Sequence, residues 1–247
     1  MSSVNGSGGS IPRIIHQIWV QGVRRMPQRY RENADTWSRR NPGWMHRLWD
    51  EWSLRELLLG GAWWPLYTAQ PDLAARADVA RYALLQHFGG VYADIDTECR
   101  RAIDPLFVRS AARLHVSLYT HPRRRRWNDL TNSFLASTPA HPLWSDVLAR
   151  LARHDVASLP TTERTGPAML ARLLEQHDAR TPADVRIIGL PFAFTSALVP
   201  VPLMRLFSRL RRENCLLDFN DAGRAEVRRV IRRAVRAGFE RRRTASC

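Results

Sequence analysis

Residues 73 to 96 place an apolar helix pattern, a Gly-Gly pair and a short β-rich run directly after one another. Six residues of the helix pattern share one side at the helical period of about 3.6 residues: Val79, Ala80, Ala83, Leu84, His87 and Phe88. Gly89 and Gly90 end the helix and suit a tight turn with a close approach of the chain. "VYADID" then predicts a strand over residues 91–96. A helix that passes straight into a strand favours an α/β fold.

The rest of the chain continues this alternation. Strands are expected at residues 14–20, 45–49, 112–120, 132–137 and 185–190. Helices are expected at residues 27–39, 53–61, 141–154 and 166–177, the second of them with Ser53 as its N-cap. Alternation of this kind predicts one α/β domain with a largely parallel sheet.

The chain divides into three expected parts. Residues 1–10 are a Gly/Ser-rich tail, residues 11–222 are the domain, and residues 223–247 form a basic amphipathic helix. The apolar residues of this helix follow i, i+3, i+4 spacing among many arginines: Val227, Val230, Ile231, Ala234 and Val235. Such a helix suits an anionic surface or a partner, or it packs on its own domain with a solvated Arg face.

Composition limits the classes of partner. The 247 residues are 45% hydrophobic, which excludes a disordered chain, and their formal net charge of +15 suits nucleic acid or anionic lipid. All 38 basic residues are arginine, which we interpret as the mark of a GC-rich genome, so the inference to nucleic acid weakens. Three scattered cysteines predict neither a disulfide framework nor a zinc site. Without a signal pattern or a long apolar run, a soluble, cytoplasmic protein is expected, with the basic helix as its one route to peripheral membrane contact.

Two aspartates follow the predicted strand at residues 91–96. In a strand, residues i and i+2 point to the same face, so Asp94 and Asp96 would present two carboxylates together while Ile95 points into the core. Hard oxygen ligands of this kind suit Mg²⁺ or Mn²⁺ held with substrate phosphates, and ligands gather at the carboxyl ends of strands in open α/β sheets. The alternative is a solvated strand end with a turn-forming aspartate.

Asp78 and Arg81 lie one turn apart on the helix face opposite the apolar stripe. A functional interpretation pairs them with the two aspartates that follow the strand. The alternative is an i, i+3 ion pair on the surface, which contributes only a few tenths of a kcal/mol, about 0.2–0.5.

Four segments, in this order, resemble glycosyltransferase family 32: "IPRIIHQIW", "RADVARYALLQHFGGVYADID", "NSFLASTPAHPLW" and "TGPAML". This family includes bacterial capsular and fungal mannosyl transferases, and it shares its core motif with the clostridial glucosylating toxins. The resemblance covers roughly residues 11 to 170, and the long central motif is its specific part. It implies a GT-A fold, a Rossmann-like domain that binds a UDP- or GDP-linked sugar with Mn²⁺ or Mg²⁺. It also implies transfer of a hexose, with retention, to a glycan, lipid or small-molecule hydroxyl.

Site residues follow from matching positions in the family motifs. Trp19 would stack on the nucleobase, and Asp78 and Arg81 would hold hydroxyls of the donor sugar. Core packing is the alternative for Trp19, and for His16 it is the interpretation we favour. Asn132 matches a polar position near the transferred sugar, with an ordinary turn residue as the alternative.

The aspartate pair also takes its roles from the resemblance. Asp94 would contact the ribose and sugar, or the metal through water, and Asp96 would bind the metal directly. Tyr92 joins the residues expected to bind the donor. The catalytic set is therefore Asp78, Arg81, Asp94 and Asn132.

The C-terminal part departs from the family pattern. Members usually carry a His and a Ser-Trp pair that complete the metal and diphosphate site, but here no His follows His177 and no Trp follows Trp144. Asp218, Asn220 or Asp221 could replace these ligands, with Asp218 as the expected metal ligand, and nearby arginines could neutralise the diphosphate.

Two other function classes compete with a transferase. The "RRRRW" run at residues 123–127 and the basic C-terminal helix fit a protein that binds nucleic acid or an anionic membrane surface, with a degenerate transferase site. A metal-dependent phosphohydrolase or a glycosidase could use the same carboxylates. The chain contains no GxxxxGK[ST], HExxH or GxSxG motif, so P-loop, zinc-protease and serine-hydrolase chemistry have no support.

Overall fold

The computed structural model describes residues 10–99, 101–108, 110–118, 130–153, 157–181 and 183–189. These residues belong to one compact unit, and a second unit begins at residue 191. Asp218, Asn220, Asp221, the run at residues 123–127 and the helix expected at 223–247 lie outside the described residues. The tail at 1–10 and the domain boundary at 222 therefore stay predictions.

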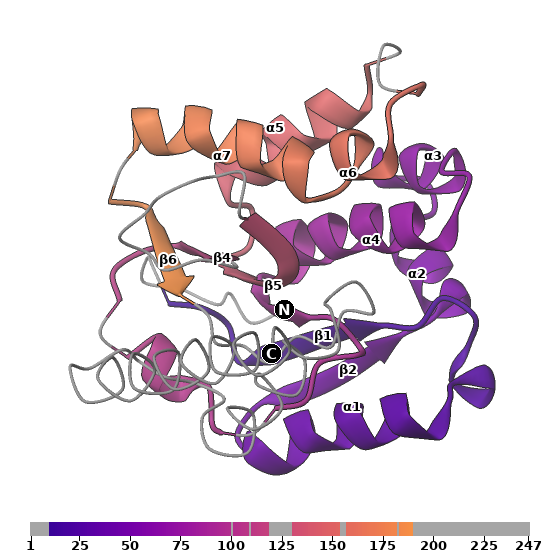
Figure 1. Cartoon of the computed structure of the whole chain (residues 1–247), viewed down its shortest axis with the longest axis vertical. Coiled ribbons are helices and arrows are strands. Elements are labelled where there is room, and N and C mark those ends of the chain that lie inside the picture. Colours follow the sequence, from indigo (N-terminus) through magenta and orange to yellow (C-terminus); the bar gives the residue numbers. More distant parts are fainter. Residues whose placement is uncertain are drawn as a thin grey trace, which may run out of the picture. The chain divides into compact units, whose positions relative to one another are not determined.

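A six-stranded sheet with the order β2-β1-β3-β5-β4-β6 forms the centre of the described unit (Figure 1). The strands are β1 (Ile14–Ile18), β2 (Met45–Trp49), β3 (Gly90–Ala93), β4 (Leu114–Leu118), β5 (Leu130–Ser137) and β6 (Val185–Gly189). β5 runs antiparallel to both of its neighbours, and the other pairs are parallel. The carboxyl ends of the parallel strands therefore meet at one edge, and the largely parallel α/β sheet is confirmed.

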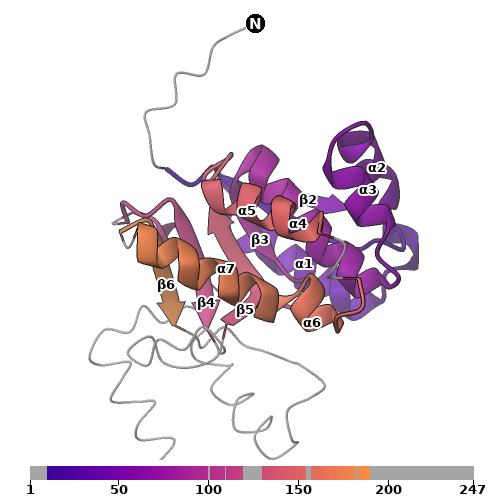
Figure 2. The ribbon, with the colours of Figure 1, turned by 90° about the horizontal axis from the view of Figure 1, so that it is seen from above.

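Helices cover the two faces of this sheet. They are α1 (Gln28–Arg40), α2 (Glu51–Leu58), α3 (Trp63–Thr68), α4 (Leu73–Phe88), α5 (Pro142–Leu151), α6 (Thr161–Arg164) and α7 (Pro167–Arg180), with short 3₁₀ turns at Val23–Arg25 and Asp104–Leu106. Figures 1 and 2 show α4, α5 and α7 on one side of the sheet and α1 on the other. None of the helices in the described part is long and apolar enough to cross a bilayer.

Local signals placed most elements, with three corrections. Helix α2 begins after Asp50, whose side chain accepts a hydrogen bond from the Ser53 N–H, so Ser53 is the N3 residue of a capping box and not the N-cap. The sequence missed α3 and α6, which are only six and four residues long. Strand β3 ends at Ala93, so the expected strand over 91–96 is too long at its carboxyl end.

Helix α4 has the predicted bounds but a different environment. Val79, Ala80 and Leu84 lie in the core as expected, whereas His87 is exposed. Asp78 and Arg81 are only 7% and 5% exposed, so a surface ion pair is wrong. Because α4 packs against α3, α5, α6 and the sheet, the face that the pattern marks as polar is enclosed as well.

The Gly-Gly turn brings β3 against β1. Gly90 has a φ of +87°, and a Cβ built there would lie 2.5 Å from the carbonyl oxygen of Ile14. Gly89 has a φ of +62°, and a Cβ built there would lie 2.7 Å from the Ser137 carbonyl oxygen and 2.6 Å from the Pro139 nitrogen. Both the turn and the close approach expected from the sequence are confirmed.

Gly90→Ala is expected to lower the free energy of unfolding by at least about 2 kcal/mol, because it adds a backbone clash to a left-handed conformation. Gly60→Ala is the matched control, since Gly60 has a φ of +82° with nothing within 4 Å of its Cβ position. The control should cost only about 1 kcal/mol. Denaturant unfolding measures both, and equal losses would show that the contact with Ile14 does not matter.

Three histidines are buried in their neutral form. Burial lowers the pKa of His16, His115 and His141 from 6.5 to about 4. The Nε2 of His16 lies 3.0 Å from the Gly89 carbonyl oxygen, and its Nδ1 accepts a hydrogen bond from the Trp49 indole. His16 is therefore a satisfied core histidine, as expected.

The free energy of unfolding is expected to be highest above pH 6.5 and to fall as the pH drops towards 4. In that window the unfolded chain protonates these histidines while the folded protein keeps them neutral, which costs up to about 1.4 kcal/mol per pH unit for each ring. Urea unfolding at pH 7.5, 6.5, 5.5 and 4.5 measures the slope. His115→Gln should reduce it, whereas His87→Gln, at an exposed position, should not. A flat profile would contradict the buried neutral state.

Candidate functional site

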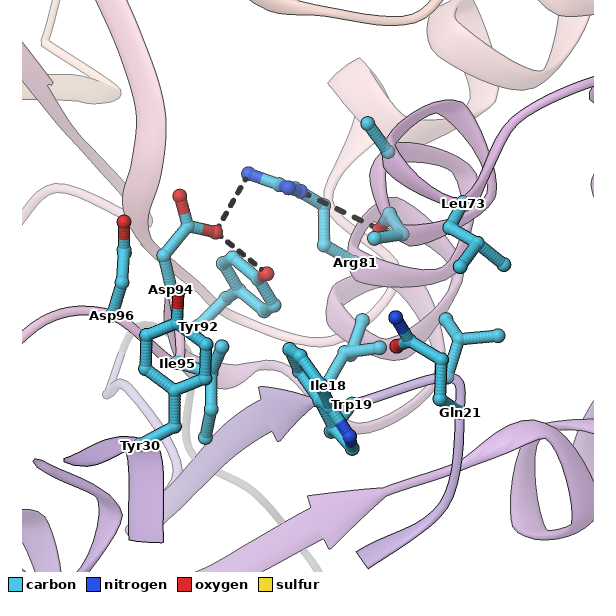
Figure 3. Close-up of a pocket in the computed structure, with 13 residues that line it drawn as sticks. Ile18, Trp19, Gln21, Tyr30, Leu73, Arg81, Tyr92, Asp94, Ile95 and Asp96 are labelled. Carbon is cyan, nitrogen blue, oxygen red and sulfur yellow. Dashed lines mark hydrogen bonds and ion pairs between the residues drawn. The ribbon is translucent and has the colours of Figure 1, made fainter. Parts of the chain in front are cut away.

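A cavity of about 270 Å³ lies at the carboxyl ends of β1 and β3 (Figure 3). It is lined by residues from the end of β1, from α1, from α4 and from the end of β3: Ile18, Trp19, Val20, Gln21, Tyr30, Leu73, Ala74, Ala77, Arg81, Tyr92, Asp94, Ile95 and Asp96. Five residues that the sequence assigned to donor or metal binding are thus brought together: Trp19, Arg81, Tyr92, Asp94 and Asp96. This is the edge at which α/β sheets bind ligands.

A turn, not a strand, presents the two aspartates. The Asp94 N–H donates to the Ser133 carbonyl at 2.8 Å, and the Thr97 N–H then donates back to the Asp94 carbonyl at 3.0 Å. The Gln17 side chain also donates to that Asp94 carbonyl. The i, i+2 strand argument is therefore wrong, but the turn still places both Asp94 and Asp96 at the cavity.

Arg81 reaches from α4 to Asp94 at the end of β3 (Figure 3), and it also contacts Asp78 on its own helix. Its Nη2 lies 3.0 Å from Asp78 Oδ1, its Nη1 lies 3.3 Å from Asp94 Oδ1, and Nη1 also donates to the Asn132 carbonyl. Its guanidinium lies 4.5 Å from the centre of the Tyr92 ring. Burial opposes the charge of Arg81, but Tyr92, Asp94 and Asp78 outweigh it and raise the pKa of Arg81. The cation is therefore permanent and held from several sides.

Asp78 and Asn132 lie behind Arg81 and do not line the cavity. Asp78 accepts hydrogen bonds from Asn132 Nδ2 at 2.8 Å and from Thr165 Oγ1 at 2.9 Å. Burial raises the pKa of Asp78, while Arg81, Thr165 and Asn132 oppose that rise. Because all three partners donate to Asp78, they favour its carboxylate form. Asn132 lies within β5 and is 8% exposed, so it is not an ordinary turn residue.

Two aromatic rings form the other wall. Trp19 and Tyr30 have ring centres 5.3 Å apart and planes tilted by 55°. Trp19 is half-buried, and its indole N–H has no hydrogen-bond partner within the described residues. Trp19 follows β1 directly, and Asp94 follows the neighbouring parallel strand β3. Stacking of a base on Trp19 stays a prediction.

The acids of the cavity suit a divalent cation. Asp94 Oδ1 accepts from Tyr92 at 2.8 Å and pairs with Arg81, while Oδ2 has no partner among the described residues. Asp94 and Asp96 bring two carboxylates, and with them negative charge, to the cavity. Carboxylate oxygens and this charge fit Mg²⁺ or Mn²⁺. Asp218, the third expected ligand, lies outside the described residues.

A second group of candidate metal ligands lies at the opposite edge of the sheet, where ligand atoms of His141, His177 and Asp184 fall within 4.8 Å of one another. Asp184 Oδ2 lies 3.0 Å from His141 Nε2 and 3.2 Å from His177 Nε2, and Arg113 binds both of its oxygens. The Leu143 N–H donates to His141 Nδ1, so the proton of the neutral ring sits on Nε2 and leaves no lone pair there for a metal. This group is a hydrogen-bonded anchor between α5, α7 and β6.

Comparison with known proteins identifies the same region. A family described as "Glycosyltransferase sugar-binding region containing DXD motif" matches residues 27–112. Inositol phosphoceramide mannosyltransferase 1 of Schizosaccharomyces pombe is 29% identical over 157 residues, which cover 62% of this chain and 46% of that protein. An uncharacterised glycosyltransferase of Acanthamoeba polyphaga mimivirus is 26% identical over 72% of this chain and 70% of its own length. The chain thus spans under half of the first fungal relative.

Solved structures share the fold. The PaToxG glycosyltransferase superposes with a TM-score of 0.57 at 16% identity, over 71% of this chain and 73% of its own. The UDP-bound glycosyltransferase domain of the YGT toxin gives a TM-score of 0.54 at 11% identity, over 90% of each chain. The sheet, the helices and these neighbours establish a GT-A fold. The matching region contains Asp94 and Asp96, so this part of the chain is similar to the sugar-binding region of DXD-motif glycosyltransferases.

Proposed function

We propose that this chain is a cation-dependent, retaining glycosyltransferase that moves a hexose from a nucleotide-diphosphate sugar to a hydroxyl acceptor. The observation that carries the proposal is that one cavity is lined by carboxylates, a guanidinium and aromatic rings together: Asp94, Asp96, Arg81, Trp19 and Tyr30. Carboxylates suit a divalent cation, the guanidinium suits phosphate or sugar oxygens, and the rings suit a base. A sugar nucleotide offers a partner to each of them: its diphosphate binds a divalent cation, its phosphate and sugar oxygens accept from a guanidinium, and its base stacks on an aromatic ring.

The chemistry needs charge stabilisation at the leaving group. When the bond between the anomeric carbon and the diphosphate oxygen breaks, negative charge grows on the diphosphate and positive charge on the sugar. Asp96 would hold the cation directly, and Asp94 would hold it through Oδ2 or water; the bound cation supplies electrostatic stabilisation of the diphosphate. Arg81 is already fixed by Asp78, Asp94 and Asn132, so it can orient the donor without reorganising.

Retention follows if the acceptor attacks from the side of the departing diphosphate. The acceptor oxygen then bonds to the anomeric carbon as the carbon–diphosphate bond breaks, and a diphosphate oxygen takes the acceptor proton. This route assigns Asp94 and Asp96 to the cation and needs neither as a nucleophile. The products are the glycoside and the protonated nucleotide diphosphate, and the reaction needs no further reactant.

The names of the relatives guide the choice of donor and acceptor. Several are called inositol phosphoceramide mannosyltransferases or mannosyl phosphorylinositol ceramide synthases. A mannosyl donor and a lipid acceptor with a phosphoinositol headgroup are therefore the first pair to test, followed by glucosyl and galactosyl donors with soluble acceptors. UDP- and GDP-linked forms both belong in the panel.

The wild-type chain is expected to release nucleotide diphosphate from one sugar nucleotide of this panel with Mn²⁺ or Mg²⁺, and to lose that activity with chelator. Asp96→Ala should lower the release by at least about 100-fold, because the charge that binds the cation is removed. Asp146→Ala is the control, since Asp146 pairs with Arg180 on the helix layer. Equal release with and without an added acceptor would instead indicate a hydrolase, and turnover unaffected by chelator would contradict the cation role.

Arg81→Lys is expected to lower kcat by about 10- to 100-fold, because an ammonium cannot reproduce the planar fork that contacts Asp78, Asp94 and the Asn132 carbonyl together. The control is Arg76→Lys on the same helix, where Arg76 lies 4.0 Å from Glu51 near the surface. Steady-state kinetics and thermal melting, measured side by side, separate lost catalysis from lost folding. Unchanged kcat in a folded Arg81→Lys protein would remove Arg81 from the mechanism.

A further inference from the structure

Thr165 reaches the site from a part of the chain that is distant in sequence. It follows α6 and precedes Gly166 and α7, and it is fully buried. Its hydroxyl donates to Asp78 Oδ2 at 2.9 Å across 87 positions of sequence. Of the donors to Asp78 in the described part of the chain, Thr165 is the one that binds Oδ2, while Asn132 and Arg81 bind Oδ1.

A second hydrogen bond fixes the backbone of the same residue. The Tyr82 hydroxyl on α4 donates to the Thr165 carbonyl at 2.8 Å, and Asn132 Nδ2 lies 3.2 Å from the Tyr82 oxygen. The turn itself is tight, since a Cβ on Gly166 would lie 2.9 Å from the Thr162 Cα. Thr165 therefore cannot shift along α4 without breaking bonds to both Asp78 and Tyr82.

The contacts form a relay that ends at the cavity. Thr165 holds Asp78, Asp78 holds Arg81 Nη2 at 3.0 Å, and Arg81 Nη1 lies 3.3 Å from Asp94. Only Arg81 and Asp94 of these four line the cavity. Without the hydroxyl, Asp78 Oδ2 is a buried acceptor with no partner, and the carboxylate can recover a hydrogen bond only by turning further towards Arg81. That movement would draw the guanidinium away from Asp94.

We propose that Thr165 is a positioning residue of the transfer reaction: its hydroxyl sets the orientation of Asp78 and, through Asp78, the placement of Arg81 against the donor sugar. This inference rests on the proposed function. It assigns Asp78 and Asn132 a supporting role behind Arg81, in place of direct contact with the donor. The nucleotide part of the donor lies against Trp19 and Tyr30 and does not depend on Thr165.

Three variants test this inference. Thr165→Val keeps the shape and removes the hydroxyl, and Thr165→Ser keeps the hydroxyl. Thr161→Val is the matched control. Thr161 begins α6, and its hydroxyl also donates to a carboxylate, that of Asp72 at the start of α4, at 3.2 Å. Asp72 neither lines the cavity nor contacts Asp78 or Arg81 in the described part of the chain. For each protein we would measure the Kd of free UDP and GDP by calorimetry with Mn²⁺, and kcat and KM for the active sugar nucleotide.

Thr165→Val should lower kcat by about 10- to 100-fold while the Kd of the free nucleotide diphosphate stays within about twofold of wild type. Thr165→Ser should restore most of kcat, and Thr161→Val should behave as wild type. Two results would overturn the positioning role. One is a wild-type kcat in Thr165→Val. The other is a loss of both nucleotide binding and turnover in Thr165→Val and in Thr165→Ser alike. A wild-type chain that neither binds nor turns over any sugar nucleotide would overturn the proposed function first, and this inference with it.

Discussion

The buried guanidinium of Arg81 holds the site together. It neutralises Asp78 inside the protein, pairs with Asp94 at the cavity and binds the Asn132 carbonyl, so it connects α4, β3 and β5. A buried charge with fewer partners would destabilise the fold by several kcal/mol, about 3–5 when one member of a pair is lost. The sheet order supplies one of these partners. Because β5 is antiparallel to β3, its first residues, Asn132 among them, lie at the edge where the parallel strands end.

The two edges of the sheet have different tasks. At the carboxyl edge, carboxylates, a guanidinium and aromatic rings face a cavity. At the opposite edge, Asp184 accepts hydrogen bonds from Arg113, His141 and His177. Burial alone would raise the pKa of Asp184, but Arg113 and the two histidines lower it below the usual value. Donors from three side chains close Asp184 off at this edge, whereas Asp94 and Asp96 line a cavity at the other.

Much of the fold followed from local patterns. The bounds of α4 and β2, the Gly89–Gly90 turn and the core position of His16 could be predicted because they depend on neighbours in sequence or on burial of apolar side chains. The burial of Asp78 could not, because it depends on α3, α5 and α6 closing over a face that the helical pattern marks as polar. Thr165 gave no signal of its own beyond its place in "TGPAML", since its partner lies 87 residues away.

Helix α4 supplies both the largest share of the core and the residues behind the cavity: nine of its side chains are buried, Asp78 and Arg81 among them. Asp78 and Arg81 therefore belong to a well-buried helix, and they connect the turn that carries Asp94 to this part of the core. The amide protons of α4 should exchange with solvent only when the whole domain opens. Loss of the site on heating and loss of the fold would then be a single cooperative event.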